Sequence, residues 1–286
     1  MTHPDGSPVS PLPDLLFAEV DARALGLEGP RLSYMEAGQG ARTVLLLHGI
    51  GANSTGWRFV LHALAPDARV IAWNAPGYFL SDGFVSEAPR AEAYADVAAA
   101  LLDALGVRGP VLLVGSSFGS MVAACLAARH PARVDRMVLL GTSRGLRWTG
   151  PEGRARMLAM RSASVAEGGV ALARTRYGKL IAPGSAPLVV ELVQRMLAAT
   201  NPRGLMQAAR CMDGVDVVED FAPRVACPTL AITCAEDVVN PPEVGRAVAD
   251  AIPGARFESP PGVGHLPELE APALTAEMIR AHLFGG

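Results

Sequence analysis

Three serines crowd the segment GSSFGS, residues 115–120, and one of them has the surroundings of a nucleophile. A short apolar run, 111–114, precedes the segment, and small and apolar residues at helical spacing follow it. A strand that turns sharply into a helix exposes the turn residue at the carboxyl edge of the sheet, where ligands bind in open α/β folds. In such a turn the residues two before and two after the nucleophile must be small, which gives the pattern G-x-S-x-G.

The register of this pattern selects one serine. Ser117 has Gly115 and Gly119 at the two required positions. Ser116 and Ser120 have larger residues on both sides. Ser117 is therefore the predicted nucleophile, and the other two serines are predicted to be small supporting residues.

A serine hydroxyl is a weak nucleophile at neutral pH, so Ser117 needs a histidine base and a carboxylate that orients this base. His265 lies in the loop GVGHLPE, after the last predicted strand, and such a loop can reach Ser117. His48 also follows a predicted strand, in LLLHGIG. The remaining histidines lie in the N-terminal segment or in predicted helices (His3, His62, His130 and His282). His265 is therefore the predicted base.

The orienting carboxylate is expected between the serine and the histidine in the sequence. Glu236 and Asp237 both lie in the loop CAEDVVNPPE, directly after the predicted strand 229–233. Three aspartates precede this strand and are predicted to be structural: Asp213, Asp216 and Asp220. The residues alone leave Glu236 and Asp237 as alternatives.

The elements that must position these residues follow an alternating pattern. Near-continuous apolar runs predict strands buried on both faces of a parallel sheet, at 43–47, 69–73, 111–114, 137–140, 229–233 and 256–258. Helical patterns lie between or after them, at 91–105, 118–129, 242–251 and 272–283. Two earlier stretches, 15–20 and 31–36, predict an antiparallel edge. The fold class is thus α/β, with a mostly parallel, doubly wound sheet of about eight strands.

One interval lacks strands. Helical patterns punctuated by Gly and Pro occupy it, at 151–167, 169–180, 187–199 and 204–212. We predict an all-helical cap, 145–215, inserted after the sixth strand. The core domain then comprises 15–144 and 216–286, and the Pro-rich segment 1–14 is predicted to be a disordered lead.

The composition excludes several function classes. The chain has 286 residues, 50% of them hydrophobic, and a formal net charge of −3. It has no basic stripe for nucleic acid and no apolar run long enough to span a membrane. The four cysteines show neither CxxC nor metal-ligand spacing. We expect a cytoplasmic protein with a small-molecule substrate, no metal and no cofactor, and we leave a homodimer open.

Five segments, in this order, together resemble the α/β-hydrolase superfamily and its cap-bearing serine hydrolases over nearly the whole chain. They are LLLHGIGANSTGW, WNAPGYFLSD, GSSFGS, CAEDVVNP and GVGHLPELEAP. The resemblance implies Asp237 rather than Glu236 as the orienting acid. It also implies an oxyanion hole formed by the backbone N–H groups of Ile50 and Phe118. His48 would then brace its loop instead of acting as a second base.

The chain departs from the family pattern at two positions. Asn74 stands where the family often has Asp, and Phe79 where it often has Gly. Neither position is catalytic, so the departures imply a reshaped loop near the pocket. The nucleophile itself is Ser, which disfavours the haloalkane dehalogenases and epoxide hydrolases of this fold, because these use Asp.

The resemblance favours a serine hydrolase of carboxylic esters or lactones that forms an acyl-enzyme. The alternative is a carbon–carbon bond hydrolase of the meta-cleavage-product type. Those enzymes resemble G-N-S-M-G at the nucleophile and His-Trp in the histidine loop, where this chain has Ser116 and Leu266. A non-catalytic small-ligand binding protein is an alternative of another class, which usually loses a triad member, and here none is missing.

The predicted substrate pocket combines the two loops with the cap. Its residues are His48, Gly49, Ser116, Met157, Met160, Met196, Val239 and Leu266. Methionines at helical spacing in the cap predict either core packing or an adaptable apolar roof over neutral acyl groups (Met157, Met160, Met196, Met206 and Met212). Three cap arginines are alternatives that would bind a substrate carboxylate, although solvated helix faces explain them as well (Arg174, Arg176 and Arg195).

Overall fold

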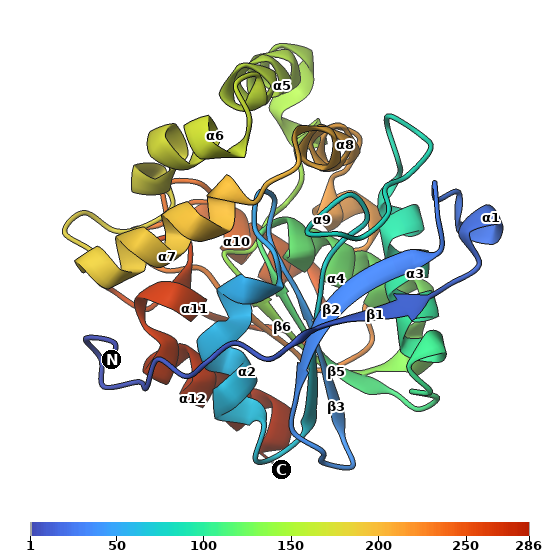
Figure 1. Cartoon of the computed structure of the whole chain (residues 1–286), viewed down its shortest axis with the longest axis vertical. Coiled ribbons are helices and arrows are strands. Elements are labelled where there is room, and N and C mark those ends of the chain that lie inside the picture. Colours follow the sequence, from blue (N-terminus) through green and yellow to red (C-terminus); the bar gives the residue numbers. More distant parts are fainter. Residues whose placement is uncertain (1, 286) are drawn as a thin grey trace.

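A sheet of eight strands forms the centre of the computed structural model, which describes residues 2–285 (Figure 1). The strand order is β1-β2-β4-β3-β5-β6-β7-β8. Strand β2 is antiparallel to both β1 and β4, and the other neighbours are parallel. The predicted fold class is therefore confirmed. The strands are β1 (Leu15–Glu19), β2 (Arg31–Ala37), β3 (Thr43–Leu47), β4 (Arg69–Trp73), β5 (Val111–Ser116), β6 (Val134–Leu140), β7 (Thr229–Ile232) and β8 (Arg256–Glu258).

The central strands are apolar throughout because helices cover both faces of the sheet. In β3, Leu45 and Leu47 pack into one core cluster, whereas Val44 and Leu46 pack into another. The first cluster also contains residues of α3 (Ala91–Ala104), α4 (Phe118–Arg129) and α10 (Pro242–Ala251). The second contains residues of α2 (Arg58–Leu64) and α12 (Pro272–Phe284).

A group of four helices lies between β6 and β7 and forms one side of the molecule (Figure 1). Their apolar faces build a separate core, which the loop residue Leu266 joins. The chain enters and leaves this group side by side, because Gly145 pairs with Asp216 in an isolated antiparallel bridge. The arrangement agrees with a helical insertion after the sixth strand, and the limits 145–215 remain our prediction. The helices are α5 (Gly150–Val165), α6 (Gly169–Arg176), α7 (Pro187–Ala198) and α8 (Pro202–Asp213).

Short helical segments complete the described chain. Three are single α-helical turns: α1 (Ala22–Leu25), α9 (Val217–Asp220) and α11 (Pro267–Glu270). The others are 3-10 turns at Ser54–Trp57, Pro131–Arg133, Arg147–Thr149, Tyr177–Lys179 and Ala222–Arg224. No helix within residues 2–285 is long and apolar enough to cross a membrane.

The N-terminal segment differs from its predicted disorder. Several residues of the segment 2–14 contact the core: His3 is buried, and Val9 and Leu12 pack against core clusters. The Nε2 atom of His3 lies 3.0 Å from the carbonyl oxygen of Leu269, and its ring packs edge-on against Phe59. Arg58 donates a hydrogen bond to the carbonyl of Ser10, and His62 contacts that of Pro11. The Pro-rich composition gives no sign of these contacts.

Candidate active site

Ser117 occupies a strained turn between β5 and α4. Its backbone has φ 52° and ψ −116°, a left-handed conformation that a non-glycine residue rarely adopts. A Cβ on Gly115 would collide with the carbonyl group of Gly119, and a Cβ on Gly119 would collide with the carbonyl group of Leu47. These close approaches are the physical reason for the G-x-S-x-G pattern. The turn holds the Ser117 side chain at the carboxyl end of the sheet.

His265 and Asp237 meet through a short hydrogen bond. The His265 Nδ1 atom lies 2.7 Å from Asp237 Oδ2, and both side chains are buried. The other carboxylate oxygen, Oδ1, accepts hydrogen bonds from the backbone N–H groups of Val239 at 2.8 Å and Asn240 at 2.9 Å. Because these donors fix the carboxylate, it can fix the orientation of the imidazole ring.

The remaining carboxylates serve other contacts. Glu236 is exposed, and its Oε2 accepts a hydrogen bond of 3.0 Å from the N–H of Val263. Of the two alternatives in this loop, the structure therefore places only Asp237 against His265. The three earlier aspartates pair with arginines: Asp213 with Arg154, Asp216 with Arg144 and Asp220 with Arg147.

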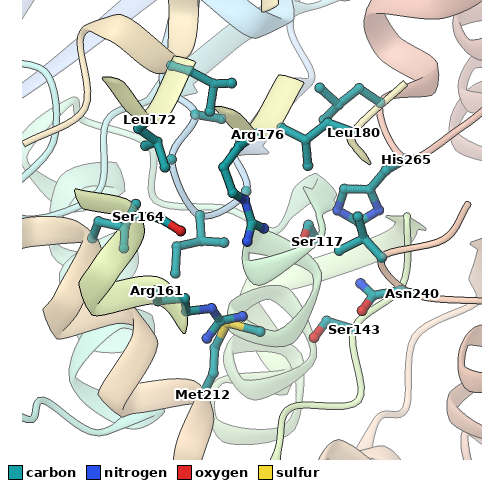
Figure 2. A pocket seen from close by; sticks show the side chains of 18 of the residues that line it. Ser117, Ser143, Arg161, Ser164, Leu172, Arg176, Leu180, Met212, Asn240 and His265 are labelled. Carbon is teal, nitrogen blue, oxygen red and sulfur yellow. The ribbon is translucent and has the colours of Figure 1, made fainter. Parts of the chain in front are cut away.

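Ser117 and His265 line one pocket beneath the cap (Figure 2). The loop that carries Ile50 borders the serine, since a Cβ on Gly49 would lie 3.0 Å from Ser117 Cβ. Within residues 2–285, neither the N–H of Ile50 nor that of Phe118 donates a hydrogen bond. The oxyanion hole remains our prediction, and these unpaired donors fit it.

His48 is buried and does not line the pocket, contrary to its prediction as a pocket residue. Its Nε2 accepts a hydrogen bond of 3.0 Å from the N–H of Ala75, so Nδ1 carries the proton and donates to the carbonyl of Gly49 at 2.8 Å. Burial lowers the pKa of His48 to about 4, which keeps the ring neutral. Both contacts brace the loop that carries Ile50.

Ser116 also lies outside the pocket, against the prediction. Successive residues of a strand point to opposite sides, so Ser116 points away from the side of Ser117. Its hydroxyl donates a hydrogen bond of 2.9 Å to Oε1 of Glu268, and both side chains are buried. Burial raises the pKa of Glu268 to about 7. None of the sequence motifs indicated that the carboxyl group of Glu268 would contact Ser116.

The pocket lining agrees in part with the predicted apolar roof. Met157 and Met196 line the pocket with Met212, Gly49, Val239 and Leu266, as predicted. Met160 and Met206 are not among the lining residues. The face of α5 that borders the pocket carries Met157, Arg161 and Ser164, at positions i, i+4 and i+7. Met160 lies beside this face.

Two arginines line the pocket, contrary to a purely apolar roof. Arg176 was one of the predicted alternatives, and Arg161 was missed. Its position four residues after Met157 was the available signal. The other predicted alternatives point elsewhere: Arg174 is exposed, and Arg195 pairs with Glu191 on the surface of α7.

The two departures from the family pattern have local explanations. Asn74 accepts a hydrogen bond of 2.7 Å from the N–H of Ser54 and donates one of 3.0 Å to the hydroxyl of Ser33, so its amide braces two segments. Phe79 has φ 39°, in the left-handed region, where a glycine would be unstrained.

Across the described residues, no group of three or more His, Cys, Asp or Glu side chains is placed to hold a metal ion.

The model of the alpha/beta hydrolase fold family matches residues 42–272 of this chain. The chain belongs to the α/β-hydrolase family. A 2-hydroxymuconate semialdehyde hydrolase of Pseudomonas sp. (strain CF600) is 29% identical over 267 residues, which cover 88% of this chain and 89% of that protein. A solved structure titled as a thermophilic esterase from Thermogutta terrifontis, malate bound, has a TM-score of 0.81 and 26% identity, covering 93% of this chain and 97% of that one.

Higher identity is confined to part of the chain. A 2-hydroxy-6-oxononadienedioate/2-hydroxy-6-oxononatrienedioate hydrolase 2 of Pseudomonas putida is 35% identical over 133 residues, which cover 45% of each chain. This chain thus matches the first four curated relatives over less than half of their own length. All of these proteins are hydrolases. The family and these named hydrolases support an enzyme rather than a non-catalytic binding protein.

Proposed function

We propose that this α/β hydrolase is a serine hydrolase that cleaves carboxylic esters or lactones through Ser117, His265 and Asp237. The observation that supports the proposal most directly is the buried hydrogen bond of 2.7 Å between His265 and Asp237. Ser117, at its strained turn, lines the same pocket as His265. A nucleophile, a base and a carboxylate that orients the base are the groups required for acyl transfer.

In this mechanism the Ser117 hydroxyl attacks the substrate carbonyl carbon, and His265 Nε2 accepts the hydroxyl proton. The N–H groups of Ile50 and Phe118 stabilise the negative charge that develops on the carbonyl oxygen. The imidazolium then protonates the leaving alcohol oxygen, which remains attached to the acyl group when the substrate is a lactone. Water, deprotonated by His265, hydrolyses the acyl-enzyme and regenerates Ser117. Asp237 holds the Nδ1 proton of His265 throughout.

Carbon–carbon bond hydrolysis is the second candidate, and the curated relatives favour it. One relative that matches along nearly the whole chain is a 2-hydroxymuconate semialdehyde hydrolase. The same three residues would serve there, with His265 protonating a carbon leaving group. The solved esterase favours the first candidate.

The cysteines support the expected cytoplasmic location, because all four are free thiols: Cys125, Cys211, Cys227 and Cys234.

The test is a substrate panel combined with active-site labelling. The purified enzyme is assayed with 4-nitrophenyl butyrate, dihydrocoumarin and a 2-hydroxy-6-oxo-dienoate, and is then inactivated with a fluorophosphonate. We expect turnover of the ester or the lactone, its loss on labelling, and the mass of the label on Ser117. Turnover of the dienoate alone would select the second candidate. Activity that survives complete labelling of Ser117 would contradict both.

A further inference from the structure

Two cationic side chains project into the pocket from neighbouring cap helices. Arg161 comes from α5 and Arg176 from α6, and both line the cavity that contains Ser117 and His265. Figure 2 shows their guanidinium groups pointing into the cavity. Arg161 is only 7% exposed, so its charge is withdrawn from solvent.

Neither arginine has a carboxylate partner within residues 2–285. The Nη1 atom of Arg161 is buried without any hydrogen-bond partner, and Nη1 of Arg176 contacts only the sulfur of Met160, at 4.0 Å. The other cap arginines behave differently, because they are exposed or form ion pairs. Arg156 and Arg174 are exposed, whereas the ion-paired arginines are Arg147, Arg154, Arg195, Arg203 and Arg210.

The pair is electrostatically unfavourable as it stands. Burial, and next the charge of Arg176, lower the pKa of Arg161 to about 10, and burial lowers the pKa of Arg176. Both groups nevertheless stay protonated at neutral pH. A buried charge without a counterion destabilises a protein, and two adjacent like charges add to this cost. An anion bound between them would compensate both charges.

We propose that Arg161 and Arg176 form a binding site for a carboxylate of the substrate. The inference rests on the proposed function, since the carboxylate belongs to the molecule whose carbonyl group Ser117 attacks. Guanidinium groups match the two oxygens of a carboxylate with parallel N–H donors. Apolar side chains make up much of the remaining lining, among them Leu172, Leu197, Leu205 and Met212. The substrate class is therefore a half-ester or lactone whose short carbon chain ends in a carboxylate.

The first test compares two substrates that differ only in charge, mono-4-nitrophenyl glutarate and its neutral methyl ester. We expect the wild-type kcat/KM to be at least about tenfold higher for the carboxylate-bearing ester, as for a charge-assisted hydrogen bond. Arg176→Gln should lower kcat/KM about 30-fold for this ester and less than about threefold for the methyl ester. Arg174→Gln is the matched control, because it removes a charge from the exposed side of the same helix, and should change neither value. Equal losses for both esters, or no wild-type preference, would overturn the proposal.

The second test separates binding from folding. Since Arg161 has no partner, Arg161→Met should maintain or raise the melting temperature while removing the preference for the carboxylate. A structural arginine would behave in the opposite way, with a lower melting temperature and an unchanged preference.

A third measurement makes the result independent of turnover. Calorimetry should detect glutarate binding to Ser117→Ala and a loss of this binding, by at least about tenfold in affinity, when Arg176→Gln is added. Failure of the proposed function would appear as absence of turnover with glutarate binding intact. Failure of the carboxylate site would appear as glutarate binding that is absent or insensitive to Arg176→Gln.

Discussion

At the scale of residues, the structure holds the nucleophile and the orienting carboxylate in different ways. Ser117 is held by its backbone conformation, not by side-chain bonds, so its hydroxyl is available. Asp237 is the opposite case, because three contacts fix its carboxylate and one of them is His265. The base is thereby oriented by a group that cannot itself rotate.

Ser117→Ala is expected to lower kcat by at least about a thousandfold on any substrate the enzyme turns over, because only the oxyanion donors and substrate binding remain. The measurement is steady-state turnover, with the melting temperature to establish folding. Ser116→Ala is the control, since Ser116 contacts Glu268 outside the pocket. If Ser116→Ala were inactive and Ser117→Ala active, the assignment of the nucleophile would be wrong.

Asp237→Asn is expected to lower kcat by about a thousandfold or more, because an amide favours the wrong tautomer of His265. Glu236→Gln should have an effect of less than about tenfold, since Glu236 contacts only the backbone of Val263 with its side chain. The same kinetic assay measures both variants. Comparable losses from the two would leave the orienting acid unassigned.

At the scale of elements, the turn α11 (Pro267–Glu270) connects the base to the rest of the site. Glu270 accepts hydrogen bonds from the N–H groups of Gly264 and Leu266, on either side of His265, and from Ala182 in the cap. Glu268 in the same turn contacts the residue before the nucleophile, through Ser116. One short helix therefore ties together the histidine loop, the cap and the strand β5 that leads to Ser117.

The buried carboxyl of Glu268 predicts a pH-dependent stability. Its pKa of about 7 in the folded protein exceeds its ordinary value of 4.5 because of burial. The folded state therefore binds the Glu268 proton more tightly than the unfolded state does. This contribution to the free energy of unfolding is complete below pH 4.5 and is lost as the pH rises through 7. The loss amounts to about 3 kcal/mol.

Urea unfolding at several pH values between 4.5 and 8 tests this prediction. Glu268→Gln should flatten the decline in the free energy of unfolding across this range. Glu243→Gln, an exposed glutamate at the start of α10, is the control and should leave the decline unchanged. A wild-type stability that does not fall, or a Glu268→Gln variant that falls equally, would contradict the assignment.

At the scale of the whole molecule, three parts of the chain lie at or near the site. The cap covers the pocket, the core contributes Ser117 and His265, and the N-terminal segment runs along the core near α2, α11 and α12 (Figure 1). His3 bonds to the carbonyl of Leu269 in α11, which is also the turn that ties the histidine loop. The N-terminal segment thus supports the site indirectly.

His3→Ala is expected to lower the free energy of unfolding by about 1–3 kcal/mol, because it leaves the buried carbonyl of Leu269 without this donor and removes the packing on Phe59. Chemical denaturation measures the loss, and limited proteolysis should show faster cleavage of residues 2–14. Asp14→Ala, an exposed change in the same segment, is the control. Equal stabilities of the wild type and His3→Ala would contradict a stabilising role of His3.

Much of the fold and of the site is determined by local sequence. The apolar runs predicted the sheet because strands buried on both faces require near-continuous apolar residues, and Phe118–Arg129 and Pro242–Ala251 emerged as helices with the expected limits. Gly115 and Gly119 identified Ser117 because a sharp turn with two close backbone approaches excludes larger residues at those positions. Such constraints act over a few residues and can therefore be read from the sequence.

Tertiary structure decided what depends on direction and on distant partners. The sequence could place Arg161, Arg174 and Arg176 in the cap, but only the packed helices determine which guanidinium groups enter the pocket and which remain in solvent. Ser116 and Glu268 are 152 positions apart, and no local pattern pairs them. Composition suggested a free N-terminal segment, whereas His3 and the carbonyls of Ser10 and Pro11 bond to residues of the core. Side-chain direction and long-range pairing are set by the packing of the whole chain, because a residue's neighbours in space come from segments that its own sequence neighbourhood does not contain.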